Sequence, residues 1–110
     1  MRSTLTACAC AAVLGAGALA AIKPVSGDVT KGKAVFEQQC ATCHNAASAE
    51  RKIGPGLKGL FKRTRLPSGQ PATEQTIRAR IEDGGNGMPA YRDLLSESEG
   101  NALIAYLRTL

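Results

Sequence analysis

Five consecutive residues restrict this chain more than any other feature: Cys40-Ala41-Thr42-Cys43-His44. The pattern C-x-x-C-H is the signature of covalent haem attachment. Two thiols three residues apart on a helix lie on one face, where each can bond one vinyl group on the same edge of a porphyrin. The next residue, His44, then projects beneath the ring and can give an imidazole nitrogen to the iron. The motif therefore predicts one haem c, covalently bound through Cys40 and Cys43.

Three other kinds of site use paired cysteines, and the sequence argues against each. A structural disulfide does not need the histidine that follows the pair. A thioredoxin-like redox pair normally lies beside a βαβ pattern, and no strand pattern appears in this sequence. A zinc site needs four ligands, yet His44 is the only histidine and no cysteine follows Cys43.

A candidate for the second axial ligand lies in a glycine-rich loop between two predicted helices. Apart from Met1, the only methionine is Met88, within the sequence GGNGMP at residues 84–89. The glycines permit close approach of the backbone to a flat ligand, and Pro89 stiffens the exit from the loop. A thioether is a soft, neutral ligand, and His/Met ligation raises the reduction potential. With His44 and Met88 both bound, the iron has no open position for a substrate, which favours outer-sphere electron transfer over catalysis.

The N-terminal segment has the three parts of a secretory signal peptide. Met1-Arg2 gives a positive start, an uncharged apolar stretch follows, and Ala18-Leu19-Ala20 offers a cleavage site. We expect residues 1–20 to be removed and the protein to be periplasmic. The alternative is an uncleaved membrane anchor, because Leu5–Ile22 has about the minimum length of a span.

The remaining chain is predicted to be a linker, residues 21–27, followed by one all-α domain, residues 28–110. Asp28 is a plausible N-cap, and Ser96 with Glu99 forms the pattern of a capping box. Glycine and proline clusters divide the predicted helices. We expect helices from Val29 to about Thr42, from after Thr73 to Gly84-Gly85, and after Ser96 with Leu103, Leu107 and Leu110 on one face, and a short helical turn at Leu57–Phe61.

From Gly27 to Leu110 the sequence resembles a class I cytochrome c of the bacterial monohaem kind. Four segments in order carry this resemblance: GDVTKGKAVF leading into CATCH, IGPGL at 53–57, NGMPAY at 86–91, and a last helix ending in LIAYL. The resemblance implies the cytochrome c fold, in which the N- and C-terminal helices cross near a right angle and loops enclose the haem.

Particular contacts are also implied by this resemblance. Gly32 and Phe36 would meet Leu103 and Tyr106 where the two helices cross. The carbonyl group of Pro55 would accept a hydrogen bond from the other ring nitrogen of His44 and so fix its tautomer.

The sequence departs from some family members because it contains no tryptophan that could bind a haem propionate. Arg63, Arg65 or Tyr91 are candidates for that role, and the sequence does not choose among them. Tyr91 fits equally well beside the haem or as a core tyrosine.

The charge of the chain points to its partners. Lys and Arg number 14 against 9 acidic residues, a net charge of +5. Six of these cations lie within residues 51–65, with no acidic residue between them. We expect this basic rim to meet an acidic docking face on an oxidase, reductase or dehydrogenase; the alternative is a solvated loop that only aids solubility. No aromatic residues alternate with the cations, which argues against nucleic-acid binding. The six are Arg51, Lys52, Lys58, Lys62, Arg63 and Arg65.

The expected function is thus electron transfer on one haem c, and the chain is not expected to be an enzyme. An alternative within electron transfer is a cytochrome subunit bound tightly to a dehydrogenase or oxidase. A haem peroxidase needs an open iron site and usually a distal acid or base, and with His44 used no histidine remains. A haem-based sensor would need an output domain, which this length does not accommodate.

Overall fold

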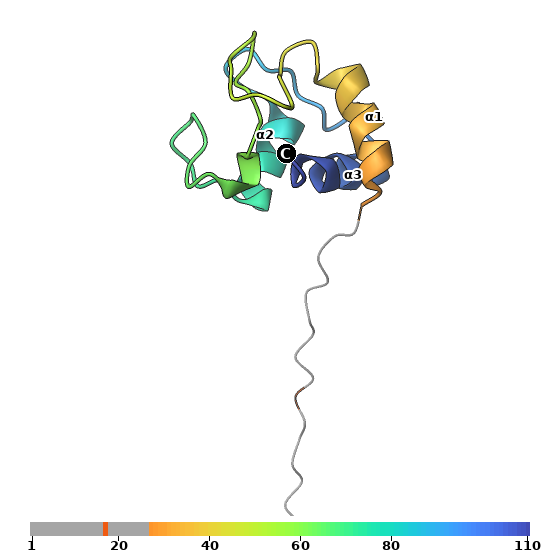
Figure 1. Cartoon of the computed structure of the whole chain (residues 1–110). Coiled ribbons are helices and arrows are strands. Elements are labelled where there is room, and N and C mark those ends of the chain that lie inside the picture. Colours follow the sequence, from red (N-terminus) through yellow and green to blue (C-terminus); the bar gives the residue numbers. More distant parts are fainter. Residues whose placement is uncertain (1–16, 18–26) are drawn as a thin grey trace, which may run out of the picture.

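The computed structural model describes Gly17 and residues 27–110, and it is all-α in this part of the chain (Figure 1). It contains α1 (Val29–Gln39), α2 (Glu74–Asp83) and α3 (Glu97–Leu107), with one 3₁₀ turn, η1 (Leu60–Lys62). The predicted signal peptide and linker lie outside the described residues, except for Gly17 and Gly27. Within these residues, no helix combines the length and apolarity needed to span a bilayer.

The predicted helix starts are confirmed, because a polar side chain caps each one. Asp28 Oδ1 accepts hydrogen bonds from the backbone amides of Thr30 and Lys31, at 2.9 and 3.2 Å. Ser96 and Glu99 form the predicted capping box at α3. Thr73 caps α2 in the same reciprocal way with Thr76. Each cap satisfies amide groups that a helix leaves unpaired in its first turn.

Helices α1 and α3 cross, and the crossing depends on a missing side chain (Figure 1). Gly32 is buried in α1, and a Cβ atom there would overlap the backbone carbonyl of Ala102 in α3. One turn later, the Phe36 and Tyr106 rings lie 5.5 Å apart at 55°, a tilted arrangement that aromatic pairs favour. The contact expected between Gly32, Phe36 and the last helix is therefore present. Together with Leu60 and Ile77, the two helices supply the buried core: Val35, Phe36, Leu103, Ile104 and Leu107.

The prediction that the first helix runs to about Thr42 was wrong, because α1 ends at Gln39. The carbonyl of Phe36 accepts from the amides of both Cys40 and Ala41, at 2.8 and 2.9 Å, which widens the last turn and ends the α-helical pattern. The carbonyl of Cys40 then accepts from the amides of Cys43 and His44. Cys40 and Cys43 therefore lie at two positions of a tight turn after α1, and not on one face of a continuous helix.

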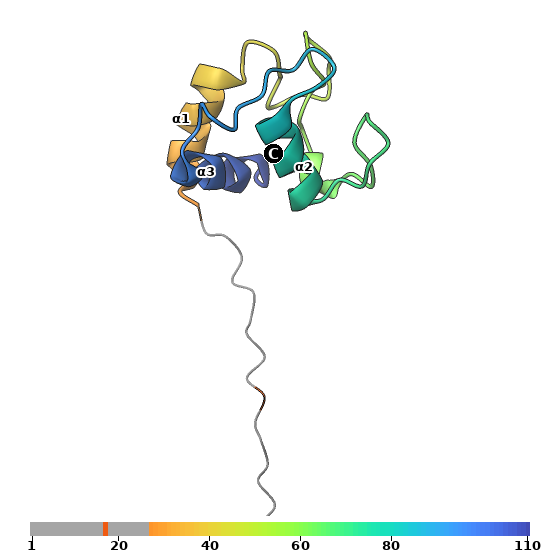
Figure 2. The ribbon, with the colours of Figure 1, turned by 180° about the vertical axis from the view of Figure 1, so that it is seen from behind.

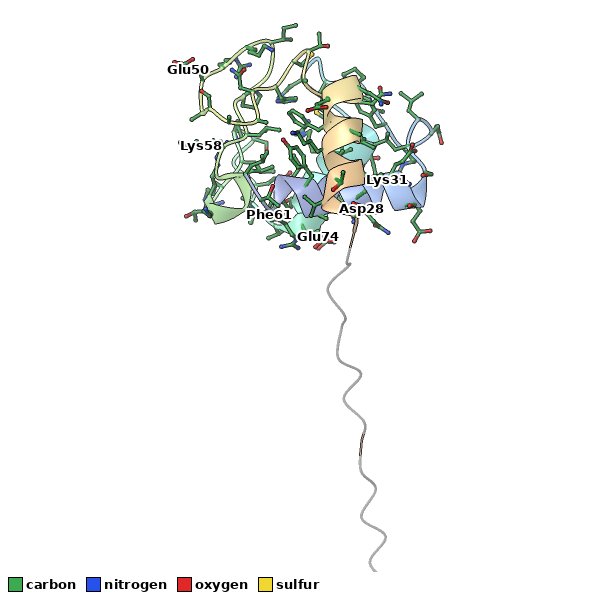
Figure 3. All side chains as sticks on the ribbon, turned by 45° about the vertical axis from the view of Figure 1, so that its right-hand side comes forward. Asp28, Lys31, Glu50, Lys58, Phe61 and Glu74 are labelled. Atoms are coloured by element: carbon green, nitrogen blue, oxygen red, sulfur yellow. The ribbon has the colours of Figure 1, made fainter. Side chains whose placement is uncertain are left out.

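The short helical turn also lies further along the chain than expected, at Leu60–Lys62 instead of Leu57–Phe61. Gly59 precedes it with a positive φ of 68°, a conformation that glycine adopts without strain. Phe61 in this turn lies beneath Arg108, whose guanidinium carbon is 4.5 Å from the ring centroid. Arg108 also pairs with Glu74, so charge and aromatic contacts join η1, the start of α2 and the end of α3 (Figure 3).

The segment between α2 and α3 returns the chain to α1. Figure 2 shows residues 84–96 leaving α2, passing the C-terminal part of α1 and descending into α3. The amides of Tyr91 and Arg92 donate to the carbonyls of Ile81 and Glu82, so this segment folds back on the end of α2. The path brings Met88 to the same side of the molecule as the motif that follows α1.

Candidate functional site

A cavity of about 330 Å³ brings the predicted site residues together. Cys40, Cys43 and His44 line it from the segment after α1, and Met88 lines it from the segment after α2. Its volume lies in the range typical of ligand pockets. The apolar side chains in its lining come from the helical core and the 53–66 loop: Phe36, Ile53, Leu57, Leu60, Leu66, Ile77, Ile81, Leu103 and Leu107.

The His44 ring is held on two sides by neighbouring chain. Its Nδ1–H donates to the carbonyl oxygen of Pro55 at 2.7 Å, the contact that the resemblance implied. Because a carbonyl can only accept, this bond fixes the tautomer in which Nε2 carries the free lone pair. The backbone of Gly54 lies against the ring, and a Cβ atom there would be 2.5 Å from His44 Cε1. In the sequence, Gly54 stands out only as part of the IGPGL segment, and that pattern does not reveal this packing role.

The loop that carries Gly54 and Pro55 is fastened to residues 45–50, where the sequence showed no signature. The Asn45 side chain donates to the Glu50 carbonyl at 2.9 Å, and the Asn45 carbonyl accepts from the amide of Leu57 at 2.7 Å. Gly56 is buried, and a Cβ atom there would overlap the backbone of Ser48. These contacts are long-range pairings within one loop, which no local sequence pattern reveals.

The two cysteines are free and half-buried. Burial, and secondly the neighbouring Cys43, raises the pKa of the Cys40 thiol from 9.0 to about 11. A cysteine used for thiol–disulfide exchange has a lowered pKa, because the thiolate is its reactive form. The environment of Cys40 therefore argues against the thioredoxin-like alternative and is compatible with a thiol that forms a stable thioether.

Met88 is presented by a two-residue hairpin built from left-handed backbone. Gly85, Asn86 and Gly87 have φ values of 126°, 52° and 84°. The backbone groups of Gly85 and Met88 exchange two hydrogen bonds, at 2.9 and 3.1 Å. Positive φ at both central residues is typical of a type I′ turn, for which Asn-Gly is the preferred pair. The Asn86-Gly87 dipeptide is a signal that could have predicted this turn from the sequence.

Tyr91 is not a core tyrosine. It lines the cavity and also links two segments of the chain. Its ring is half-buried and lines the cavity, and its hydroxyl donates to the carbonyl of Gln39 at 2.9 Å. Gln39 is the last residue of α1, so this bond ties the chain that follows Met88 to the start of the Cys40–His44 turn. Burial, followed by the effects of Cys40 and Cys43, raises the pKa of the Tyr91 hydroxyl, which therefore remains protonated at neutral pH.

The candidate propionate-binding residues are separated by their positions. Arg63 lines the cavity and donates to the carbonyls of Gly56 and Lys58 at 2.7 and 2.9 Å. Arg65 is exposed, donates to the Gly69 carbonyl and does not line the cavity. The geometry favours Arg63 over Arg65, and it argues against Tyr91, whose single hydroxyl proton is donated to the Gln39 carbonyl. Arg51 and Arg80 also line the cavity.

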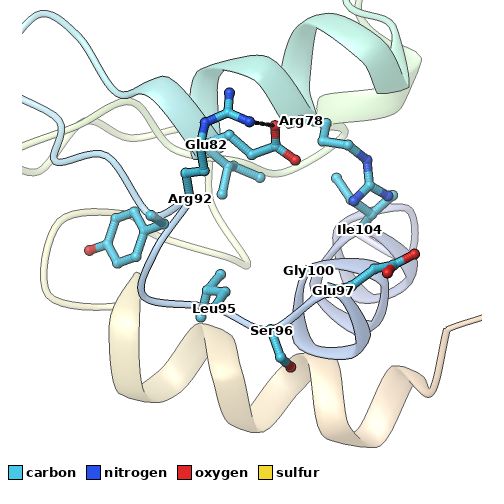
Figure 4. Close-up of a pocket in the computed structure, with 10 residues that line it drawn as sticks. Arg78, Glu82, Arg92, Leu95, Ser96, Glu97, Gly100 and Ile104 are labelled. Atoms are coloured by element: carbon cyan, nitrogen blue, oxygen red, sulfur yellow. Dashed lines mark ion pairs between the residues drawn. The ribbon is translucent and has the colours of Figure 1, made fainter.

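A second pocket, of about 220 Å³, lies between α2, α3 and the segment that joins them (Figure 4). Arg92 crosses its rim and pairs with Glu82 at 3.2 Å. Arg78, Ser96 and Glu97 also line it, and no thiol, thioether or imidazole does. The donors expected for a haem therefore belong to the first cavity alone.

The chemistry of the first cavity fits haem c. It offers two thiols for covalent attachment, an imidazole with its Nε2 free, a thioether from a separate segment of the chain and an apolar lining. Among residues 27–110, no three His, Cys, Asp or Glu side chains gather closely enough to hold a metal ion themselves. The donor set therefore fits an iron porphyrin better than a bare metal ion.

Comparisons with known proteins agree with the conclusion that the donor set fits an iron porphyrin. A model of the family described as "Cytochrome C oxidase, cbb3-type, subunit III" matches residues 27–107. A cytochrome c6-like protein of Nostoc sp. is 37% identical over 76 residues, which cover 69% of this chain and 65% of that protein. Cytochrome c oxidase subunit 2 of Alkalihalophilus pseudofirmus is 33% identical over 94 residues, 80% of this chain. This chain thus spans 27% of the oxidase subunit and slightly under two thirds of the Nostoc protein.

The fold has a solved counterpart. The crystal structure of cytochrome c6 from the diatom Phaeodactylum tricornutum superposes with a TM-score of 0.57 at 32% identity. The superposition covers 76% of this chain and 93% of the diatom protein. The match therefore includes almost the whole of that domain, and not a single shared helix pair.

Proposed function

The chain belongs to the cytochrome c family, as a monohaem class I member with one covalently bound haem c, and we propose that it carries single electrons. Haem c supplies the one-electron Fe(III)/Fe(II) couple when bound. Cys40 and Cys43 would hold the haem covalently, and His44 and Met88 would be its axial ligands. The observation that carries the proposal is one cavity lined by both thiols, the imidazole and the only thioether among residues 27–110.

Each of these residues has a defined task. The carbonyl of Pro55 accepts a hydrogen bond from the Nδ1–H of His44 and so keeps Nε2 available and basic. The type I′ hairpin presents Met88, which lines the same cavity as His44. If His44 and Met88 both hold the iron, no position at it would be left for a substrate, so we expect the chain to exchange electrons and not to act as an enzyme.

The test is an oxidised-minus-reduced absorption spectrum of protein matured in a host that attaches haem c. We expect a low-spin c-type spectrum with a weak far-red band from sulfur bound to ferric iron, and Met88→Ala should abolish that band. Leu66→Ala is the control, because it removes a half-buried side chain from the same cavity without removing a donor. A high-spin spectrum that does not respond to Met88→Ala would mean an open iron site and would favour the peroxidase or sensor alternatives.

We propose that the basic rim at residues 51–65 docks an acidic face of an oxidase, reductase or dehydrogenase. Arg51 and Arg63 line the cavity, and Lys58 and Lys62 are exposed beside it. Because Arg63 also bonds two carbonyls of its own loop, Lys62 is the better position for charge reversal. Lys62→Glu should slow the second-order rate with the partner and flatten its salt dependence. Lys33→Glu makes the same charge change on exposed α1 and should leave the rate unchanged; equal rates for both variants would remove the docking role.

A second candidate is a cytochrome unit bound permanently to an oxidase, which the family description and the oxidase relative favour. Native purification decides between the two, because a carrier elutes at the size of a single small domain and a subunit co-purifies with a large haem-copper partner.

We also propose export to the periplasm with removal of residues 1–20. N-terminal sequencing of the purified protein should begin at Ala21, and a sequence beginning at Met1 would instead favour an anchor.

A further inference from the structure

Arg80, near the end of α2, lies directly against the loop that presents Met88. Its Nη1 donates to the carbonyl of Gly84 at 3.0 Å. A Cβ atom at Gly85 would overlap the same Nη1 atom. Arg80 is half-buried and lines the main cavity. The guanidinium is therefore in contact with the first residues of the hairpin and faces the cavity as well.

Other arginines of the helical part are used differently. Arg78 and Arg108 pair with Glu74, and Arg92 pairs with Glu82 and Asp83. Within the described residues, Arg80 forms no ion pair with a carboxylate. A half-buried cation without a counter-charge is costly unless it makes hydrogen bonds. The bond from Arg80 to Gly84 is thus the main polar contact that its guanidinium makes within residues 27–110.

The hairpin needs support because it has few side chains of its own. Gly84, Gly85 and Gly87 carry none, and Asn86 is exposed. Glycine loses more conformational freedom on folding than other residues, so this backbone is poorly restricted by its own sequence. A contact from a neighbouring helix can hold it in one conformation.

We propose that Arg80 is a positioning residue for Met88, acting by bracing the Gly84-Gly85 backbone from α2. This inference rests on the proposed function, in which Met88 is the axial ligand opposite His44. Loss of the brace would allow the hairpin to move, so that Met88 exchanges more readily for an external ligand.

The test is displacement of Met88 by imidazole in the ferric holoprotein, followed through the far-red band. Arg80→Met keeps the stem and removes the donors, and it should lower the half-saturating imidazole concentration about tenfold, the effect typical of residues that orient a metal ligand. Arg78→Met is the matched control on the same helix and should titrate like the unaltered protein. Displacement of Met88 in Arg80→Met at the unaltered concentration would overturn the proposal.

Two further variants keep the test decisive if Arg80→Met does not mature. Arg80→Lys retains charge and stem but lacks the planar fork, and should fall between the unaltered protein and Arg80→Met. Gly85→Ala places a methyl group against Arg80, whereas Gly87, whose φ is also positive, has open space for a methyl group. The effect of Gly85→Ala should shrink in the Arg80→Lys background and that of Gly87→Ala should not. Equal behaviour of Arg80→Lys and the unaltered protein would also overturn the proposal.

Failure of this inference can be told apart from failure of the proposed ligation. If the far-red band is absent, or survives Met88→Ala, then Met88 is not the ligand and the proposed function needs revision. If the band depends on Met88 while imidazole displaces it equally in the unaltered protein and in Arg80→Met, only the role of Arg80 is wrong.

Discussion

The two walls of the cavity hold their candidate ligands in different ways. On the first wall, His44 directly follows Cys43, bonds the carbonyl of Pro55 and packs against Gly54. On the second, Met88 ends a hairpin of glycines and one exposed asparagine. The second wall is held from outside, by the contacts of Arg80 and Tyr91.

This difference indicates where the site can change. A ligand next to two covalent attachment points, with its ring orientation fixed, has little freedom to leave the iron. A thioether on a glycine-rich loop is held less firmly, because the backbone of such a loop has more conformations to lose on folding. We therefore expect substitutions on the first wall to affect assembly and stability, and those on the second to affect ligand exchange.

The largest effect should follow removal of the covalent attachment on the first wall. In the double variant Cys40→Ala, Cys43→Ala neither thiol of the C-x-x-C-H motif remains to form a thioether, so haem should separate completely from the denatured chain. A denaturing gel stained for haem measures this directly. The protein with Met88→Ala should keep its stained band, because the second wall contributes no covalent bond. Haem retained by the double cysteine variant would contradict the attachment proposed here.

Next in size is the packing behind His44. Gly54→Ala places a methyl group 2.5 Å from the imidazole Cε1, and because the ring is fixed we expect a loss of about 2 kcal/mol in the free energy of unfolding. Denaturant titration of the holoprotein provides the measurement. Gly100→Ala is the control: its new Cβ would have only an Arg78 nitrogen nearby, at 3.6 Å, and in mid-helix it should stabilise by about 0.5 kcal/mol. Equal stability of Gly54→Ala and the unaltered protein would mean that the first wall is less rigid than its contacts indicate.

The sequence predicted the first wall better than the second. The all-α fold and the helix starts at Asp28, Thr73 and Ser96 follow from local patterns and were confirmed in the structure. Cys40, Cys43 and His44 of the motif line the cavity. The end of α1 was predicted wrongly, because Cys40 and Ala41 share one carbonyl acceptor and the propensities of these residues do not encode that geometry.

Sequence patterns missed the two supports of the second wall for different reasons. Tyr91 bonds Gln39 across 52 positions. Arg80 is close in sequence to Gly84. However, it is one of two arginines in an amphipathic helix, and that pattern predicts a solvent-exposed cation. Only the path of residues 84–91, which turns back over the end of α2, gives Arg80 its contact.

A smaller effect is expected at the tether between the two walls. Tyr91→Phe removes the hydrogen bond to the Gln39 carbonyl and should cost about 1 kcal/mol of unfolding free energy. It should also make Met88 easier to displace by imidazole, since the hairpin would lose its link to α1. Tyr106→Phe is the control, because that hydroxyl has no hydrogen-bond partner among residues 27–110, and it should change neither quantity. A Tyr91→Phe protein less stable but unaltered in imidazole binding would show that the tether serves the fold and not the second wall.

The smallest effect should lie away from both walls, at the Glu74 cluster beneath the cavity. Hydrogen bonds from Arg108, and to a smaller extent from Arg78, lower the pKa of the Glu74 carboxyl. A lowered pKa in the folded state contributes stability above the ordinary carboxyl range, and this contribution is lost as the pH falls through the folded pKa. Because the side chain is partly exposed, with 30% of its surface accessible, Glu74→Gln should cost only about 0.5 kcal/mol at pH 7.

The pH dependence and the spectrum together make Glu74→Gln a control for the comparison of the two cavity walls. Its deficit in unfolding free energy should shrink toward zero as the pH falls through the lowered pKa of folded Glu74, because Glu74 in the unaltered protein then becomes protonated as well. Neither the far-red band nor the imidazole titration should change, because Arg108 and Glu74 join the helix ends and contact neither His44 nor the hairpin. If Glu74→Gln released Met88 as readily as Arg80→Met does, the imidazole titration would measure the overall stability of the protein and not the support of the hairpin. The distinction between the first and the second wall would then fail.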